Sequence, residues 1–433
     1  MLSWDVSKKG SENMTAMGNA MEEAPQRNQK EEKKIAFGRV WTDSACDPYG
    51  GVKWTTRDAR ISNGAGETIF EQCGVEVPEG WSQLATNVVV SKYFRGALGS
   101  EQRETSVGAL INRVTDTITR WGLEDGYFAR DEDAAVFRDE LVYMLLHQYA
   151  SFNSPVWFNV GVEQDPQCSA CFINSVDDSL ESILTLVQTE GNLFRYGSGS
   201  GVNISNVRGS REPIRGGGIA SGPLSFMRGL DAFAGAIKSG GKTRRAAKMV
   251  MLDIDHPDIQ DFIHAKTVEE EKAVALTRQG YDGSFEGEAY KSVFFQNANH
   301  SIRIPDEFMA KVKTRESWKT INRVDGSVAS VLNSHTLLNE IASAAWRTGD
   351  PGVQFHTTIN AWNTCKASGE ITGSNPCSEY MFLTDSACNL ASLNLMKFRS
   401  EDTKLDIASF RHGVRILITA QDMAAYEPIW ADP

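Results

Sequence analysis

The spacing of apolar positions predicts helices in the N-terminal part of the chain. Apolar residues recur three and four positions apart from Val107 to Ile118, and again from Phe137 to Tyr149. This spacing places them on one face of a helix. We expect the first helix to stop at Gly122, because glycine commonly follows a helix end. The segment 37–150 is therefore predicted to be a mostly helical domain.

After Phe152 the pattern changes to short apolar runs, glycine-rich turns and intervening helices, which is typical of an α/β domain. Residues 248–252 predict a buried strand. A helix is expected near Asp178, because Asp178 and Glu181 have the spacing of a capping box. Another is expected at Pro223, since proline is favoured in a first helical turn.

The two ends of the chain differ from its middle. Residues 1–36 are polar with mixed charges, so we expect a disordered tail. A last helix is predicted for residues 411–424, and the residues after it contain neither a closing strand nor a polar tail. We therefore expect residues 151–433 to be the first part of a domain that is cut at Pro433.

The composition of the chain argues against several classes of function and location. With 44 Lys and Arg against 56 Asp and Glu, the 433-residue chain has a net charge of −12, which argues against stable nucleic-acid binding. The sequence has neither the apolar core of a signal peptide at its start nor the roughly 18 apolar residues of a membrane span. Seven thinly spread cysteines suit a reducing compartment, so we expect a cytoplasmic protein.

Cys168 and Cys171 form a Cys-x-x-Cys pair. A zinc site would need a second pair of ligands at suitable spacing, and none follows, so no metal site is predicted. A thioredoxin-like pair would need a helix after its first cysteine, whereas Phe172 and Ile173 look like a strand. Two buried thiols remain the simplest interpretation of the pair itself.

The segment Ser374–Glu379 contains an amide, a thiol and a carboxylate at alternate positions, namely Asn375, Cys377 and Glu379. In an extended or turning segment these side chains would project to one side. A carboxylate can act as a general base, and a thiol can donate a hydrogen atom or attack as a nucleophile. The alternative, which the residues alone favour, is a proline-containing turn with a half-buried cysteine.

Two glycine-rich segments could contact a ligand. Residues 197–203 would let a ligand approach the backbone closely. Residues 239–243 end like a phosphate-binding P-loop, but the motif requires glycine where Ala236 stands. The basic run 242–248 could meet an anion or be a solvated loop.

Taken together and in their order along the chain, several of these segments resemble the catalytic chain of ribonucleotide reductase, most closely the adenosylcobalamin-dependent class II enzymes. The resemblance runs from about Val40 to Trp430 and is specific because several motifs occur in sequence. They are Ser151–Asn159, Cys171 ahead of Asp177–Ser179, Tyr196–Gly201, Gly240–Met249, Asn375–Glu379 and Ala387–Leu390.

The resemblance implies a ten-stranded α/β barrel, incomplete here and preceded by the helical domain, with a radical cysteine on a loop inside it. Cys377 matches that thiyl-radical cysteine, and Asn375 and Glu379 match its flanking amide and general base. Cys171 and Cys388 match the pair that reduces the ribose and becomes a disulfide, which makes Cys168 the extra thiol. The positions that match substrate contacts are Ser154, Ser198, Gly199, Pro376 and Ser378.

The resemblance also implies a cofactor and partners. Adenosylcobalamin would generate the thiyl radical, a ribonucleotide would be the substrate, and a thioredoxin-like protein would re-reduce the cysteine pair. Asp178, Ser179 and Arg208 match positions that hold a deoxynucleotide effector at the interface of a homodimer. The loops that relay the effector's identity to the substrate would contain Arg215, Gly216, Lys242, Arg244 and Arg245.

Two alternatives stay open. The first alternative is the large subunit of a class I enzyme, which would take its radical from a protein partner. The sequences of the Asn-Pro-Cys-Ser-Glu and Ser-Phe-Asn-Ser-Pro segments favour class II. The second alternative is that the chain is an inactive nucleotide-binding fragment, because the resemblance implies a barrel that continues beyond the equivalent of Pro433. On that basis we expect no turnover by this chain alone. The sequence leaves open whether the substrate is a diphosphate or a triphosphate.

Overall fold

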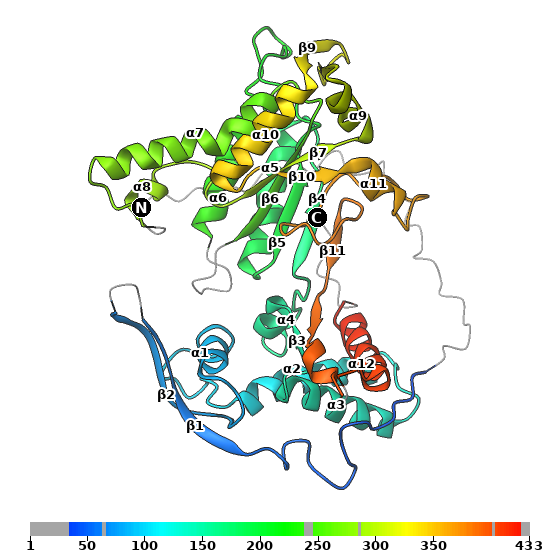
Figure 1. The fold of residues 1–433 in the computed structure, drawn as a ribbon. Helices are drawn as coiled ribbons and strands as arrows, with labels where there is room; N and C mark the ends of the chain where they lie inside the picture. The colour runs from blue at the N-terminus through cyan, green and yellow to red at the C-terminus, as the bar shows by residue number, and fades with distance from the viewer. Residues whose placement is uncertain (1–33, 63–65, 238–245, 285–286, 401–402, 426–433) are drawn as a thin grey trace, which may run out of the picture.

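The computed structural model describes residues 34–62, 66–237, 246–284, 287–400 and 403–425 (Figure 1). Most of the predicted tail, the basic residues Lys242, Arg244 and Arg245, and the segment 427–433 lie outside the described residues. Of the predicted tail, Ile35 is described, and it forms a β-bridge with Phe128. Its apolar side chain packs against the core formed by the first helices.

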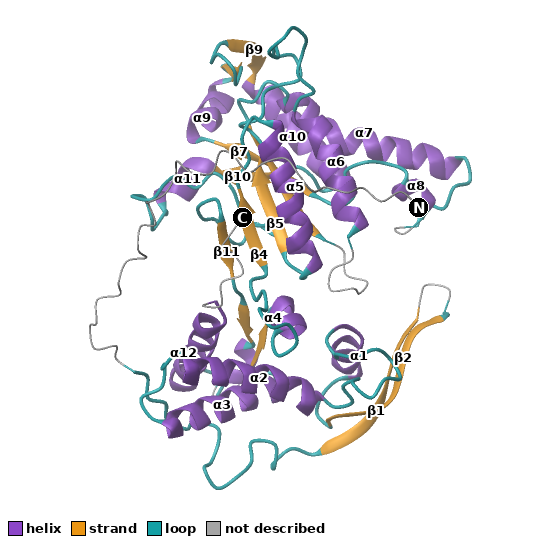
Figure 2. Cartoon of the chain, turned by 180° about the vertical axis from the view of Figure 1, so that it is seen from behind, coloured by secondary structure: helices purple, strands orange, loops and turns teal. Residues whose placement is uncertain are grey.

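The chain forms two bodies (Figures 1 and 2). In the lower body, helices pack together and a long antiparallel hairpin lies along one side of them (Figure 1). Its elements are β1 (Trp54–Ser62), β2 (Thr68–Pro78), α1 (Gln83–Lys92), α2 (Val107–Glu124), α3 (Asp131–Leu146) and the late helix α12 (Ile407–Ala425). The two predicted helices of this region are thus α2 and α3.

Helix α2 begins where Ser106 caps it, since the Ser106 hydroxyl accepts a hydrogen bond from Ala109 N at 3.0 Å. The prediction that it stops at Gly122 is wrong, because the helix continues to Glu124. Gly122 lies inside the contact between α2 and α12, where a Cβ would come within 2.5 Å of Met423 Cε. This glycine therefore allows two helices to approach closely.

Glu140 of α3 anchors the chain segment that precedes β1. Its carboxylate is fully buried and accepts hydrogen bonds from the backbone N–H groups of Val40 and Thr42 at 3.2 and 2.9 Å. His412 Nε2 of α12 lies 2.8 Å from the same carboxylate. One side chain thus joins three parts of the chain that are far apart in sequence.

The upper body is an α/β domain built on a 6-stranded sheet whose strand order is β10-β7-β6-β5-β4-β11. Strand β11 runs antiparallel to β4, and the other neighbouring strands are parallel to each other. Its strands are β4 (Cys171–Asn174), β5 (Gly199–Asn203), β6 (Ala247–Asp253), β7 (Asn299–Ile304), β10 (Gly352–Phe355) and β11 (Ser386–Cys388). The predicted α/β pattern after residue 152 and the strand at 248–252 are confirmed.

Four helices cover one face of this sheet (Figures 1 and 2). They are α5 (Leu180–Arg195), α6 (Pro223–Ala236), α7 (Ile259–Arg278) and α10 (Ser334–Thr348). Their apolar side chains form one core with Val202, Val250 and Ile302 of the strands. Because strand side chains alternate, Asn203, Asn299 and Arg303 point to the opposite face. The smaller elements are α8 (Glu288–Lys291), α9 (Asp306–Thr314), β8 (Ser317–Ile321), β9 (Val328–Asn333), α11 (His356–Ala361) and the 3₁₀ turn η1 (Leu395–Phe398).

The start of α5 differs from the prediction. The cap is Ser179, whose hydroxyl accepts from Ser182 N at 3.1 Å, so the proposed capping box of Asp178 and Glu181 is wrong by one residue. The Asp178 carboxylate instead binds Arg208. The prediction of Pro223 in the first turn of α6 is confirmed.

A short connection joins the two bodies. It consists of β3 (Ala150–Phe152), its antiparallel partner β12 (Ala391–Leu393) and α4 (Ser154–Asn159). Val156 and Cys168 belong to the core of the lower body, so this core extends past the domain boundary predicted at residue 150. Within the described residues, no helix combines the length and the apolar character that a membrane crossing requires.

We predict that Glu140→Gln destabilises the chain by about 2–3 kcal/mol at pH 7, since an amide cannot accept all of these hydrogen bonds in a buried site. Burial alone would raise the Glu140 pKa, but hydrogen bonds from His412 and Thr42 outweigh it and hold the pKa below its usual value. A carboxyl whose folded-state pKa is lowered stabilises the fold above its unfolded pKa and loses that contribution as pH falls.

Urea unfolding of both forms between pH 7 and pH 4 tests this prediction. The difference between wild type and variant should shrink toward pH 4. Glu124→Gln, on the exposed end of α2, is the control and should change little. A difference that stays constant over this pH range would contradict the assignment.

Candidate active site

The segment around Cys377 is a tight turn and not an extended strand. Ser378 N donates to Asn375 O at 3.1 Å, and Asn375 pairs with Tyr380 through its backbone N–H and its side-chain oxygen. Ser378 has a positive φ of 61°. Of the extended and turning forms expected for this segment, the structure has the turn, and the proline-containing turn is confirmed except that its cysteine is exposed and not half-buried. Asn375 is fully buried, whereas Cys377 is exposed on the tip.

The strand residues that point away from the helices hold this turn. Asn203 Nδ2 of β5 donates to Thr372 O at 2.8 Å, and Asn299 Nδ2 of β7 donates to Pro376 O at 3.1 Å. The chain from 372 to 376 thus lies across the open face of the parallel sheet. Met251 of β6 contributes its sulfur, which accepts from Ser374 N at 3.2 Å.

The glycines of β5 are required for this placement. A Cβ on Gly201 would overlap the carbonyl oxygen of Ser374, and a Cβ on Gly199 would lie 2.8 Å from Pro376 Cγ. The sequence suggested that this glycine-rich segment lets a ligand approach the backbone. In the structure it is the turn of the same chain that approaches.

A buried hydrogen-bond chain supports the turn from behind. Gln354 Nε2 of β10 donates to the hydroxyls of Ser374 and Ser378 at 2.8 and 3.2 Å. Arg303 Nη1 in turn donates to Gln354 Oε1 at 3.0 Å. Both Gln354 and Arg303 are buried, at 3% and 1% exposure, so the position of the Cys377 turn is tied to two rigid strands.

The chain of contacts continues to the protein surface. Arg303 Nη2 lies 2.8 Å from His356 Nδ1. Because a guanidinium can only donate, Nδ1 accepts and the His356 proton lies on Nε2, which faces Glu370 Oε1 at 3.0 Å. No carboxylate of the described residues forms an ion pair with Arg303. Burial lowers the pKa of its guanidinium, and the charges of Asp253 and Glu370 oppose this from farther away.

Cys171 and Cys388 lie directly opposite each other on β4 and β11. Opposed residues of antiparallel strands have Cα atoms about 4.5–5.5 Å apart. This separation lies inside the range of roughly 4.4–6.8 Å that a disulfide spans. Both cysteines are free thiols here, Cys171 buried and Cys388 half-buried.

The thiols share an electrostatic environment with the turn. Burial raises the pKa of Cys171 to about 11, the Asn375 side chain lowers it in part, and the charges of Glu379 and Cys377 raise it further. Burial and the Glu379 carboxylate also raise the pKa of Cys388. Asn375, Cys377, Glu379, Cys171 and Cys388 therefore form one cluster, with both cysteines of the pair protonated at neutral pH.

The predicted substrate contacts lie beside this cluster. Ser154 is the first residue of α4 and follows Asn153. The Asn153 side-chain Nδ2 donates to Asn389 Oδ1 at 3.1 Å, and Asn389 is the residue after Cys388. Tyr93 and Ser154 share a hydrogen bond of 3.1 Å. Ser198 precedes Gly199, is buried, and donates its hydroxyl to Ser169 O at 2.8 Å. Ser198 thus already has a structural partner.

The predicted effector residues form a second cluster at the opposite end of β4. Arg208 Nε donates to Asp178 Oδ2 at 2.6 Å, and Ser179 caps α5 beside them. Arg215 and Gly216 follow in an exposed turn in which Gly216 has a φ of 97°. The other three residues predicted for the specificity loops lie outside the described residues.

Sequence reasoning missed Asn203, Asn299, Arg303 and Gln354, which position the turn. Their signal is a polar residue at alternate positions of an otherwise apolar strand, as in Ile302-Arg303-Ile304. Of the described residues, no three His, Cys, Asp or Glu side chains form a group that could hold a metal ion.

We predict that mild oxidation with diamide links Cys171 to Cys388, as judged by peptide mapping with mass spectrometry. The raised thiol pKa values mean that the reactive thiolate becomes more abundant with each step in pH. The rate should therefore keep rising from pH 7 to pH 10. Cys168→Ser should leave the product unchanged, whereas Cys171→Ser should abolish it. A rate that levels near pH 9, or a crosslink to Cys168, would contradict this geometry.

A second prediction concerns Gly201. Gly201→Ala places a methyl group against the Ser374 carbonyl and should cost about 1–3 kcal/mol in denaturant unfolding. Gly229→Ala is the matched control, because no atom lies within 4 Å of its Cβ position in α6, and it should be neutral or slightly stabilising. Equal effects of the two substitutions would show that the turn does not depend on close approach.

Comparison with known proteins identifies relatives of this chain. The family described as "Ribonucleotide reductase, barrel domain" matches residues 169–427, and "Class II vitamin B12-dependent ribonucleotide reductase" matches residues 55–148. A vitamin B12-dependent ribonucleotide reductase of Streptomyces coelicolor is 52% identical over 397 residues, which cover 90% of this chain and 41% of that protein.

Two further relatives are also described as vitamin B12-dependent reductases. A vitamin B12-dependent ribonucleotide reductase of Rhodopirellula baltica is 50% identical, over 89% of this chain and 41% of its own length. A vitamin B12-dependent ribonucleoside-diphosphate reductase of Thermoplasma acidophilum is 33% identical, over 60% of this chain and 31% of its own length. The chain thus spans about two fifths of the length of the Streptomyces and Rhodopirellula relatives.

Proposed function

This chain belongs to the class II, vitamin B12-dependent ribonucleotide reductase family, and we propose that it carries the thiol chemistry by which the whole protein reduces ribonucleotides to 2′-deoxyribonucleotides. The expected family and its α/β barrel, in part, are confirmed by the match of the barrel domain to residues 169–427. The observation that carries the proposal is the cluster of the Cys377 turn with the opposed pair Cys171 and Cys388.

In the proposed reaction, a Cys377 thiyl radical takes the hydrogen atom from C3′ of the ribose. The Glu379 carboxylate accepts the 3′-hydroxyl proton, and the Asn375 amide orients the reacting groups. The 2′-hydroxyl leaves as water after it receives a proton from one thiol of the pair. The other thiol delivers a hydrogen atom to C2′, and the resulting disulfide of Cys171 and Cys388 passes one further electron to the substrate while Glu379 returns its proton to the 3′-oxygen. Cys377 finally returns its hydrogen atom to C3′.

The environment of the pair supports this division of roles. Thiols whose pKa values are raised stay protonated at neutral pH and can therefore serve as proton donors. Their direct opposition on two strands lets the disulfide form without a large movement of the backbone. Pro376 and Ser378 lie within the turn and Gly199 lies beneath it, which is the basis for proposing that these residues border the ribose.

Adenosylcobalamin supplies, when bound, a carbon-centred radical through homolysis of its cobalt–carbon bond. Cys377 lies exposed on the tip of its turn, which fits a reaction with a group that arrives from outside the chain. Asn375, in contrast, is fully buried behind Cys377 and holds the turn in place. The family match over residues 55–148 supports the class II assignment over a class I large subunit.

We also propose regulation and partners by extension from the family. The cluster of Asp178, Ser179 and Arg208 combines a helix N-terminus with a guanidinium, a combination that suits a nucleotide phosphate. A deoxynucleotide effector at this cluster of a homodimer, a thioredoxin-like reductant for the cysteine pair, and a cytoplasmic location complete the proposal. Whether the substrate is a diphosphate or a triphosphate stays open.

We predict that Cys377→Ala abolishes turnover and leaves the fold intact. Glu379→Gln should lower turnover by roughly 100- to 10,000-fold, the usual contribution of general acid–base catalysis. The assay follows conversion of a labelled ribonucleotide with and without adenosylcobalamin, in the protein extended to the length of its relatives, and circular dichroism checks folding. Cys73→Ala, an exposed cysteine of β2, is the matched control and should retain activity. Turnover by the Cys377 variant, or turnover independent of adenosylcobalamin, would refute the proposal.

A further inference from the structure

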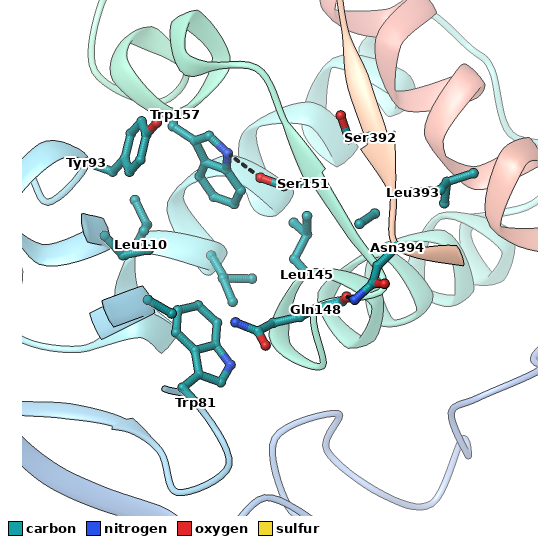
Figure 3. Close-up of a pocket in the computed structure, with 14 residues that line it drawn as sticks. Trp81, Tyr93, Leu110, Leu145, Gln148, Ser151, Trp157, Ser392, Leu393 and Asn394 are labelled. Atoms are coloured by element: carbon teal, nitrogen blue, oxygen red, sulfur yellow. Dashed lines mark hydrogen bonds between the residues drawn. The ribbon is translucent and has the colours of Figure 1, made fainter. Parts of the chain in front are cut away.

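A cavity of about 330 Å³ lies where the lower body meets the connection of β3, α4 and β12 (Figure 3), and residues 375–379 are not among the described residues that line it. Its walls come from α1, α2, the end of α3 and the pair β3 and β12. Of the described residues that line it, most are apolar and none is charged. Trp81, Tyr93 and Trp157 contribute aromatic rings, with Tyr93 and Trp157 side by side and Trp81 across from them (Figure 3).

The two indoles are held in fixed orientations. Trp81 Nε1 donates to Leu146 O at 2.9 Å, and Trp157 Nε1 donates to Phe152 O at 3.0 Å. Because both N–H groups are already bonded to the backbone, the rings meet the cavity with their carbon surfaces. A flat apolar ring that enters here finds preformed surfaces on which to stack.

A polar edge borders the same cavity. Gln148 projects its amide toward the space, and Ser151 and Asn394 lie beside it. Gln148 has a positive φ of 59°, a conformation that non-glycine residues rarely adopt. The backbone carbonyl of Gln148 accepts a hydrogen bond from Asn394 Nδ2 at 3.2 Å. An amide with both donor and acceptor atoms suits the hydrogen-bonding edge of a nucleobase.

A second cavity of about 280 Å³ adjoins the first, since Trp81 and Gln148 line both. Unlike the first, it is bordered by the basic residues Lys53 and Lys397, and Glu79 is the acidic residue on its wall. In a chain of net charge −12, two lysines at one cavity form a local site for an anion.

We propose that the two cavities form one binding site for a nucleoside phosphate, with the base stacked between the aromatic side chains of the first and the phosphate held by Lys53 and Lys397 in the second. Nucleobases stack readily on aromatic side chains, and lysine binds phosphate as a point charge. A smaller ligand that also combines a flat ring with an anionic group, such as a single aromatic acid, would fill only a fraction of the two cavities of about 330 and 280 Å³. No residue of the thiol cluster or of the cluster of Asp178 and Arg208 is among the described residues that line either cavity, although Tyr93 of the first cavity hydrogen-bonds Ser154.

Two sources could present this ligand chemistry, namely a free nucleotide and the base–ribose–phosphate tail of a cobalamin. Photolabelling of the 433-residue chain with 8-azido-adenosine diphosphate tests the site directly. We expect adducts on peptides that contain Trp81, Gln148 or Asn394. Label that is confined to peptides of residues 171–208 or 372–389 would place the nucleotide at the other clusters and overturn the proposal.

Matched variants separate the two halves of the site. Lys53→Met with Lys397→Met should weaken labelling by roughly 10-fold or more, the usual effect of losing bonds to a charged group, and should abolish competition by pyrophosphate. Lys313→Met removes the same charge from exposed α9 and should have no effect. Gln148→Gly keeps the backbone conformation, so it should weaken competition by adenosine and leave that by pyrophosphate unchanged.

Competition then identifies the source. Displacement of the label by hydroxocobalamin but not by cobinamide, which lacks the nucleotide tail, would assign the site to the cofactor's tail. Displacement by ADP but by neither corrinoid would assign it to a free nucleotide. Labelling of the lysine variants at the wild-type level would overturn the proposal. No turnover enters these measurements, so their outcome is independent of the proposed reductase activity.

Discussion

The close contact between the Cys377 turn and the open face of the parallel sheet is the constraint on which the candidate site depends. Gly199 and Gly201 have no side chains, and the turn occupies the space that a Cβ would need. Asn203 and Asn299 then satisfy backbone carbonyls of the loop that would otherwise be buried without partners. A reactive thiol is thereby placed on a short turn whose base is rigid, while its tip stays accessible.

The same sheet positions the cysteine pair. Register alone decides that Cys171 and Cys388 face each other, because a shift of one residue would send one side chain to the other side of the sheet. Burial and the Glu379 carboxylate then raise the pKa of Cys171 and of Cys388. Position and protonation of the pair therefore arise from one arrangement of strands and turn.

The lower body supports this arrangement from a distance. Helix α12 follows β12 in the sequence but packs on α2, where Gly122 allows Met423 to approach closely. Glu140 joins the segment before β1 to α3 and α12. These contacts return the chain to the lower body after it has formed the Cys377 turn and the strands β11 and β12. The aromatic cavities lie in this same body, next to β3 and β12.

The sequence by itself determined the helices α2 and α3, the change to an α/β pattern, the strand β6 and the ordered motifs that indicate the family, because these depend on local periodicity and on residue identity. It could not determine that the Cys377 turn packs against Gly199 and Gly201, that Ser179 rather than Asp178 caps α5, or that Gly122 lies inside a helix contact. Those features depend on residues that are distant in the chain, namely Ser374 for Gly201, Arg208 for Asp178 and Met423 for Gly122. Only the tertiary structure brought Gln354 and Arg303 behind the turn, since a polar residue in a strand does not reveal which distant loop it will meet.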